Sequence, residues 1–423
     1  MFSTLFGIVL ALAGVIGPLF YDPFWGLAIF SCFTHITPMQ LHIEYFRVPL
    51  VLSLISILSY TLGRKYESKF QRWPLEFWLL LIMVGGMVVS GMHAYDIDAA
   101  WNGNGISLFF KFIIFYLLLV NIINSRWKFD WFINAQILSA AWMVYKCWDL
   151  RGTTGARFEN VNGGIVNDGN QYAAALILLL PIVAAKVFKK GYLAVRIGAA
   201  LGVFGMLMSI IITTSRGGFL GITALCCSFV VLFRKARIKL IFFLLAIGIA
   251  VSPFVPEFYV ERISTIFVSG DEGELEKTSS GRLNSWALAV DLWKEQPILG
   301  VGLNNFGYYM AVKEGKTWGE RGHVVHSIWL QPLAEGGVVV FGPFMILLIL
   351  FFYRTNKIKK AVRGSELEID ISALQVGMFG FLVSATFVDR LFYEPIYWWS
   401  ALGVSLTYFY NDESFSQKRN LIK

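Results

Sequence analysis

The stretch GNQYAAALILLLPIVAAKVFKKGYLAVRIGAALGVFGMLMSIIITTSRGGF, residues 169–219, decides the class of fold. It holds two apolar runs, at 171–188 and 193–213, which are separated only by a short basic connection. Each run is close to the roughly 20 residues that an α-helix needs to cross a bilayer. Because lipid offers no partner for backbone N–H and C=O groups, continuous apolar runs of this length must be helical. The stretch therefore predicts two membrane-spanning helices.

The same pattern extends over the whole chain. Of its 423 residues, 56% are hydrophobic and 15% are charged, and the mean hydropathy is +0.61. Soluble domains usually carry about 25% charged residues, and a transmembrane barrel would need alternating apolar and polar residues. We therefore expect an all-α, polytopic integral membrane protein with about 12 transmembrane helices. The further runs lie at 4–20, 23–37, 48–63, 75–93, 105–124, 131–148, 217–233, 238–255, 333–353, 371–388 and 396–410.

Lysine and arginine gather in every second connection, as the positive-inside rule predicts for cytoplasmic loops. We interpret the net charge of +8 as orientation charge, not as a nucleic-acid surface. The other connections then face outward, and the longest of them spans 256–332. We expect one integrated membrane domain, with transmembrane helices at 1–255, an outward loop with an amphipathic helix at 256–332, and transmembrane helices with a cytoplasmic tail at 333–423.

A very short outward turn carries the first candidate site residue. Thr213-Thr214-Ser215-Arg216-Gly217-Gly218 joins two apolar runs. An arginine at the membrane boundary is costly unless it has an anionic partner or reaches water, and neighbouring glycines let a ligand approach the backbone. The turn indicates an anion site at Arg216. The alternative is an arginine that only reaches for water from a tight turn.

The second candidate lies in the long outward loop. Leu283, Trp286, Val290 and Trp293 fall on one face of a helix. We expect this helix to begin at Ser279 or Ser280 and to end by Pro297 with Gly300. Arg282 would then sit in the first turn, beside free N–H groups, which predicts an anion site. The alternative is an ordinary surface arginine.

Two histidines precede the run at 333–353. Histidine changes protonation near neutral pH and suits general-base chemistry. His326 lies nearer the membrane span and is the preferred base, whereas His323 is the alternative. A histidine at an interface can also simply be hydrogen-bonded.

Arg157, in a Gly- and Asn-rich outward connection, is a further cationic candidate, and we expect Asp389, Arg390 and Glu394 to pair with one another. Patterns such as H-E-x-x-H, C-x-x-C, a Walker loop or G-x-S-x-G are absent from the sequence, which disfavours metal, nucleotide and serine-hydrolase chemistry.

Taken in order, these motifs resemble the O-antigen ligase and O-antigen polymerase family of bacterial envelope glycosyltransferases. The resemblance covers roughly 170–345 and rests on Ser215-Arg216-Gly217-Gly218, Gly281-Arg282 with Trp286, Pro297-x-x-Gly300-x-Gly302, His326-Ser327-x-x-Leu330 and Leu333-Ala334-Glu335-Gly336-Gly337. The first apolar hairpin, Thr37-Pro38 and the loop around Arg157 also resemble the exosortase-associated O-glycosylation ligase branch. Gly337 is followed by valines where the family often has a G-x-x-G pair, so the class of acceptor stays open.

The resemblance implies an inverting transfer of a glycan from undecaprenyl diphosphate to an acceptor hydroxyl at the periplasmic face of the bacterial inner membrane. It implies no metal and no other cofactor, and an acceptor that is a lipid, a protein or a growing glycan. Arg216 and Arg282 would bind the diphosphate, and His326 would deprotonate the acceptor. The residues expected to bind substrate are Arg157, Arg321, His323, Trp286 and Glu335. A polymerase of the same family and a transporter or flippase of lipid-linked sugars remain alternatives.

Overall fold

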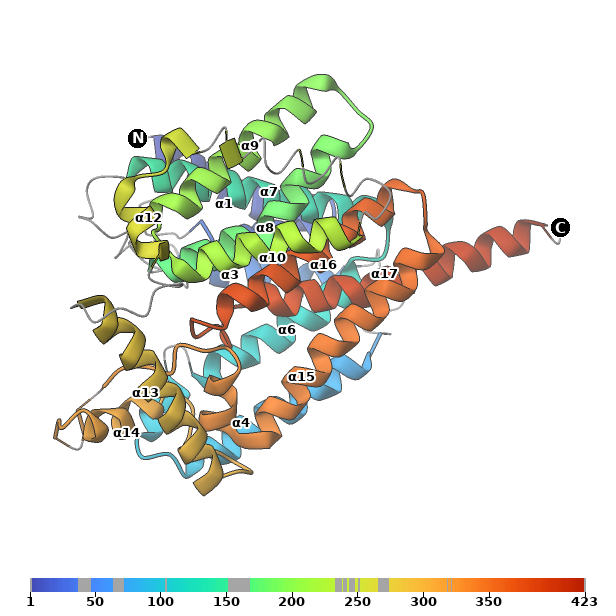
Figure 1. The fold of residues 1–423 in the computed structure, drawn as a ribbon. Coiled ribbons are helices and arrows are strands. Elements are labelled where there is room, and N and C mark those ends of the chain that lie inside the picture. Colours follow the sequence, from blue (N-terminus) through green and yellow to red (C-terminus); the bar gives the residue numbers. More distant parts are fainter. Residues whose placement is uncertain are drawn as a thin grey trace.

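The computed structural model describes residues 2–36, 47–63, 72–102, 105–150, 168–232, 238, 242, 248–249, 252–264, 274–317, 319–320 and 322–421. Every element in these ranges is helical (Figure 1). The helices of the bundle are α1 (Phe2–Phe20), α2 (Pro23–Cys32), α3 (Val48–Leu62), α4 (Leu75–Met92), α6 (Ile106–Ile122), α7 (Arg126–Asp149), α8 (Gly169–Phe188), α9 (Leu193–Ile212), α10 (Arg216–Leu232), α15 (Leu330–Ala361), α16 (Glu366–Ala385) and α17 (Pro395–Leu421). The shorter or peripheral elements are α5 (Ile97–Trp101), a 3-10 turn (Ser252–Phe254), α12 (Glu257–Ser264), α13 (Glu274–Glu295) and α14 (Phe306–Lys313).

The prediction of an all-α polytopic membrane protein is confirmed. Seven helical stretches of the described residues are long and apolar enough to cross a membrane. Pro23–Cys32, Val48–Leu62 and Arg216–Val231 are apolar but shorter. The run predicted at 238–255 falls largely outside the described residues.

The helix predicted at 23–37 ends early, at Cys32. The chain turns there because its next residues have polar partners elsewhere in the bundle. Thr34 Oγ1 donates to Glu394 Oε2 over 3.3 Å, and His35 Nε2 lies 2.7 Å from the Tyr393 hydroxyl. Since buried polar groups must find partners, these contacts end the helix before it reaches the length of a span.

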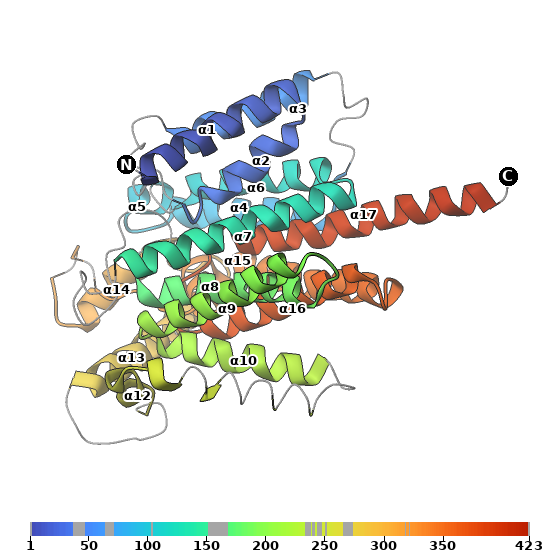
Figure 2. The same cartoon turned by 90° about the horizontal axis from the view of Figure 1, so that it is seen from above.

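Ion pairs join the basic connections at one end of the bundle. Asp370, at the start of α16, pairs with Arg126 at the start of α7 (2.5 Å) and with Lys189 just after α8 (2.6 Å). Arg354 pairs in the same way with Glu76, near the start of α4. In Figure 2 the C-terminus lies beyond one end of the bundle, while α12, α13 and α14 gather at the other. Among the described residues, the basic connections that carry Arg126, Lys189 and Arg354 therefore share one end of the protein.

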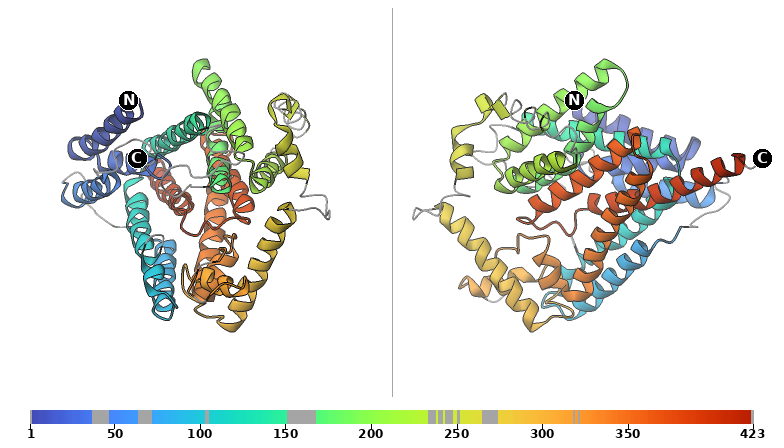
Figure 3. Two further views of the ribbon diagram at one scale, coloured as in Figure 1. Left: turned by 90° about the vertical axis from the view of Figure 1, so that its left-hand side faces the viewer. Right: turned by 45° about the vertical axis from the view of Figure 1, so that its right-hand side comes forward.

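Helix α16 lies close to both α8 and α10, as the end-on view in Figure 3 shows. A β carbon at Gly377 would lie 2.4 Å from the carbonyl oxygen of Leu178, and one at Gly380 would lie 2.4 Å from a methyl group of Leu225. Small residues let helix backbones approach closely, which is how helices gain contact inside a membrane. This packing brings the beginnings of α8 and α10 to the same level as the end of α16.

Candidate active site

Helix α15 is broken near its start, and the break is held by the loop after α13. Gly337 has φ 61° and ψ −165° inside the helix. Val338 N donates to Pro297 O over 2.9 Å, and Val301 N donates to Ala334 O over 3.0 Å. A β carbon at Gly337 would lie 2.2 Å from Ile298 O, so only glycine fits. The motif Pro297-x-x-Gly300-x-Gly302 and the motif that ends in Gly336-Gly337 therefore pack against each other as one structural unit. This unit sets the position of the first turns of α15.

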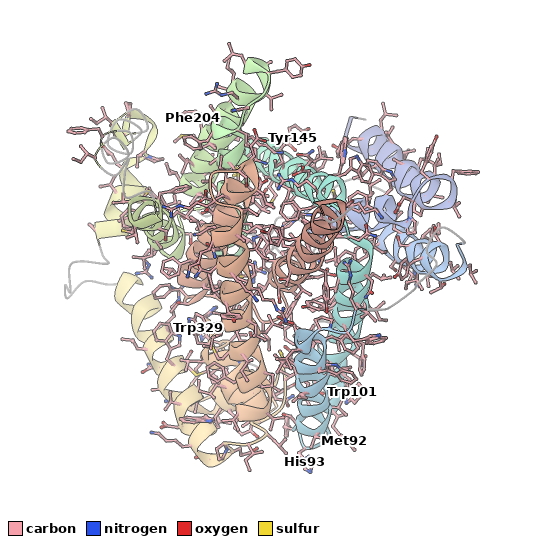
Figure 4. All side chains as sticks on the ribbon, turned by 90° about the vertical axis from the view of Figure 1, so that its right-hand side faces the viewer. Met92, His93, Trp101, Tyr145, Phe204 and Trp329 are labelled. Atoms are coloured by element: carbon pink, nitrogen blue, oxygen red, sulfur yellow. The ribbon has the colours of Figure 1, made fainter. Side chains whose placement is uncertain are left out.

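The segment just before α15 carries His326. This residue has φ 56°, a left-handed conformation that is uncommon outside glycine and costs on the order of 1–3 kcal/mol. Asp389 accepts hydrogen bonds from the backbone N–H groups of His326 and Ser327, the latter over 3.1 Å. Trp329, labelled in Figure 4, donates from Nε1 to Thr386 Oγ1 over 3.0 Å. These contacts hold His326 beside the connection between α16 and α17.

The turn before α10 places Arg216 at the same connection. Ser215 caps the helix, because its Oγ accepts from Gly218 N over 3.0 Å and donates to Asn170 Oδ1 over 2.8 Å. A β carbon at Gly217 would lie 3.1 Å from Ser384 O and 3.7 Å from the β carbon of Phe387. Glycine at this position thus lets the first turn of α10, which begins at Arg216, lie directly against the end of α16.

Helix α13 differs from the prediction in its start and in its buried face. It begins at Glu274 and not at Ser279 or Ser280. Arg282 therefore lies in the interior of the helix, and the anion site predicted from free N–H groups of a first turn is wrong there. Leu283 is 63% exposed, so it does not belong to the buried face. The buried positions are instead Ser285, Ala289 and Leu292.

Helix α13 nevertheless faces the connection between α16 and α17. The Trp286 ring lies 5.8 Å from the Phe387 ring, centroid to centroid, with an angle of 30° between the planes. Arg282 precedes Trp286 by four residues, one helical turn, so the two side chains leave α13 on the same side. Trp286 therefore contacts the connection, with Arg282 on the same side of the helix.

We call residues Ala385–Asp389 the hub segment. Ala385 O accepts from Ile328 N over 3.0 Å, and Asp389 accepts from Ser327 N. Phe387 packs against the Trp286 ring and against Gly217, in the turn that carries Arg216. The structure thus brings the local segments of Arg216, Trp286 and His326, which are far apart in the sequence, around one connection.

His323 lies apart from this cluster. Its side chain is 70% exposed, and its Nδ1 is hydrogen-bonded to Glu314 Oε1. Burial alone would raise the pKa of Glu314, but hydrogen bonds from Lys316 and His323 outweigh it and lower that pKa to about 2. Of the two candidate bases, His326 is therefore the one held at the hub segment. The predicted substrate-binding residues Arg157 and Arg321 lie outside the described residues.

Glu335 is buried beside the hub segment. Its Oε1 accepts from Phe306 N over 3.3 Å, and its Oε2 accepts from Gln331 Nε2 over 3.4 Å. Its side chain lines a cavity of about 90 Å³ together with Asn304, Gly307, Gly322, Val324, Val325, Gln331 and Asp389. Glu335 thus holds the loop before α14 against α15, at a cavity that reaches the residues preceding His326.

Sequence reasoning missed the role of the connection after α16. The sequence predicts that Asp389, Arg390 and Glu394 pair with one another. Two of them have partners outside this group, because Asp389 accepts from Ser327 N and Glu394 accepts from Thr34. Burial raises the pKa of Asp389 to about 6, against the effect of its two backbone hydrogen bonds and of Arg390. Burial also lowers the pKa of Arg390 to about 10, which leaves it protonated at neutral pH. The only local signal was an Asp-Arg pair directly after an apolar run.

Comparison with known proteins points to one family. Residues 201–345 match the family model described as O-antigen ligase. The match covers about a third of the chain and includes Arg216, Arg282, His326 and Glu335. No curated protein matches the chain.

Proposed function

We propose that this chain, whose residues 201–345 match the O-antigen ligase family model, transfers a glycan from undecaprenyl diphosphate to an acceptor hydroxyl at the periplasmic face of the inner membrane. The observation that carries the proposal is the hub segment. Around it lie the turn of Arg216, the side of α13 that carries Trp286 and Arg282, and the strained His326. The ion-paired basic connections lie at the opposite end of the bundle, which supports a periplasmic location for the hub segment under the positive-inside rule.

In the proposed reaction the acceptor oxygen attacks C1 of the donor sugar. The new bond forms on the face opposite the leaving group, so the anomeric centre inverts. His326 takes the proton of the acceptor hydroxyl, and the electron pair of the broken C1–O bond leaves with undecaprenyl diphosphate. A positioned base of this kind contributes roughly 10²–10⁴-fold to the rate.

Arg216 and Arg282 serve the leaving group in this proposal. Guanidinium stays protonated and makes bidentate, charge-assisted hydrogen bonds to phosphate oxygens. Two such groups would supply the positive charge that the departing diphosphate requires, so the proposed transfer uses no metal or other cofactor. Their effect is catalytic to the extent that they bind the diphosphate more tightly in the transition state than in the donor.

The remaining predicted residues would bind the substrates. The Trp286 ring contacts Phe387 at a tilt of 30°, and Trp286 would contribute its indole ring to the binding of a sugar. His323 and Arg321 precede His326 in the same loop and would contact the acceptor or the glycan. Arg157 would hold a second phosphate or a sugar oxygen. Glu335 would bind substrate from its position in the wall of the small cavity.

A transfer assay tests this function. Purified protein would receive radiolabelled glycan on undecaprenyl diphosphate, with lipid, protein or glycan acceptors, in the presence of EDTA. We expect transfer by the wild type, weaker transfer by His323→Ala, and loss of transfer in His326→Ala and Arg216→Ala. Arg196→Ala, which removes a guanidinium from the start of α9 at the opposite end of the bundle, serves as the control for Arg216.

The outcomes separate the alternatives. Label that stays on the polyprenyl diphosphate in longer chains would identify a polymerase, whereas label on a new acceptor would identify a ligase. Full activity of His326→Ala would remove His326 as the base, and loss of transfer in His323→Ala alone would assign that role to His323. Absence of transfer to every acceptor, together with movement of the labelled lipid across vesicle membranes, would replace the proposal with a transporter.

A further inference from the structure

A groove on the side of the bundle lies between α7, α8 and α9. Its volume is about 470 Å³, within the roughly 300–1,000 Å³ of typical small-molecule sites. Ten of its twelve lining residues are glycine or apolar, and Asn134 and Lys186 are the two with polar side chains.

The groove exists because α9 diverges from its neighbours. A β carbon at Gly205 would lie 2.9 Å from Val144, and one at Gly202 would lie 3.3 Å from Val183. At Gly198, one further turn toward the start of α9, a β carbon would meet nothing within 4 Å. Figures 1 and 3 show the start of α9 standing away from the bundle. The space between the helices therefore widens toward the basic connection that follows α8.

Lys186 carries a positive charge that the nearby ion-pair cluster does not balance. The ion-pair cluster near the end of α8 contains two cations, Arg126 and Lys189, and two anions, Asp130 and Asp370. The two anions balance the two cations, and Lys186 adds a further positive charge within electrostatic reach of the cluster. In the described part of the chain, its ammonium group has no hydrogen bond and no ion pair.

An apolar groove with one uncompensated cation at its wide end fits a specific kind of molecule. The walls suit a hydrocarbon chain, and an ammonium group within a membrane calls for an anionic partner or a path to water. A phosphate attached to an acyl chain satisfies both requirements at once. Asn134 adds an amide that can hydrogen-bond to a phosphate or an ester oxygen.

We propose that this groove binds an anionic phospholipid, with one acyl chain between α7, α8 and α9 and with the phosphate group at Lys186. The site lies at the end of the bundle that carries the basic connections, so the lipid would come from the leaflet at that membrane surface. The proposal does not depend on the proposed glycan transfer, because the groove uses other residues than the hub segment.

Native mass spectrometry of the purified full-length protein tests the proposal. The probes are phosphatidylglycerol and phosphatidylcholine with identical oleoyl chains, each added to the protein in detergent. One basic residue at a membrane surface contributes about 1 kcal/mol toward an anionic lipid, so we expect about fivefold tighter binding of phosphatidylglycerol than of phosphatidylcholine. Lys186→Gln should abolish this preference. Lys190→Gln removes the same charge from the adjacent connection, outside the groove, and should keep it.

A second pair of variants tests the apolar part of the site. Gly198→Leu would fill the groove, since a side chain there meets nothing within 4 Å, and it should weaken the binding of both lipids. Ala200→Leu adds the same side chain at an exposed position of α9 and should leave binding unchanged. An unchanged preference in Lys186→Gln, or an equal loss in Lys190→Gln, would overturn the proposal. So would a change of oligomeric mass in Gly198→Leu with intact lipid binding, because the groove would then be a contact between copies of the chain.

Discussion

The carboxylate of Asp389 accepts the backbone N–H of Ser327 over 3.1 Å, and the same carboxylate accepts the N–H of His326. One side chain after α16 therefore fixes two consecutive peptide units just before α15. Because His326 has an unfavourable positive φ, its conformation depends on such external contacts. Asp389 thus positions the proposed base through the backbone.

Replacement of Asp389 should lower the rate of transfer without preventing donor binding. Hydrogen bonds to a charged group contribute about 1.5–3 kcal/mol, so we expect kcat of Asp389→Ala to fall by roughly 10–100-fold. Asp389→Asn keeps an acceptor oxygen and should lie between this variant and the wild type. Steady-state kinetics with the KM for the donor as a second readout check the prediction. Equal kcat values for all three proteins would show that Asp389 does not position His326.

The pH dependence of transfer should report Asp389. The pKa of Asp389 is raised to about 6, so its carboxylate gains a proton as the pH falls through that value and loses strength as an acceptor for the N–H groups of His326 and Ser327. We expect the logarithm of kcat/KM to fall more steeply below about pH 6 in the wild type than in Asp389→Asn, whose side-chain amide does not titrate. Identical slopes would contradict a role of Asp389 in this range.

Asp389 affects stability and transfer in opposite directions: a rise in pH that would speed transfer lowers the stability of the native state. The native state binds the proton of Asp389 more tightly than the unfolded chain does, because the ordinary pKa of aspartate is near 4. As the pH rises from about 4 to about 6, this group therefore lowers the free energy of unfolding. Thermal unfolding of the wild type and Asp389→Asn at several pH values should show this contribution only in the wild type.

The break in α15 should tolerate no side chain at Gly337. Gly337→Ala would place a β carbon 2.2 Å from Ile298 O at a φ of 61°. The backbone conformation alone costs roughly 1–3 kcal/mol, and displacement of the loop adds to it. Gly85→Ala, in the interior of α4, is the control, since a β carbon there meets nothing within 4 Å, and it should be neutral or stabilising by up to about 1 kcal/mol. Apparent melting temperatures at one scan rate in detergent compare the two; similar values would show that the break is not needed for stability.

Contact between α13 and the hub segment should appear as coupling between Trp286 and Phe387. Their rings are 5.8 Å apart, and such aromatic pairs contribute about 0.5–1.5 kcal/mol beyond burial. A double-mutant cycle with Trp286→Ala and Phe387→Ala, measured as transfer rates, should give a coupling energy in this range. Trp286→Phe should retain most of the coupling. Additive effects of the two alanine variants would mean that α13 acts independently of the hub segment.

Much of the fold could be predicted from the sequence because the membrane acts on one segment at a time. The runs predicted at 75–93, 171–188 and 193–213 correspond to α4, α8 and α9 to within two residues at each end. The length and apolarity of a run suffice for such predictions. The same local reasoning failed at α2 and α13. Helix α2 ends where Thr34 meets a partner far away in the chain, and α13 begins at Glu274, ahead of the predicted Ser279 or Ser280.

The sequence by itself determined which helices form and which polar residues stand at their ends, among them Arg216, Arg282 and His326. Only the tertiary structure decided that their segments meet around Ala385–Asp389, that Asp389 holds the backbone of His326, and that Gly337 breaks α15 against the loop at 297–302. The physical reason is the range of the interactions. Transfer into lipid depends on each segment's own composition, whereas a hydrogen bond or a close backbone contact depends on a partner that chain folding must first bring near.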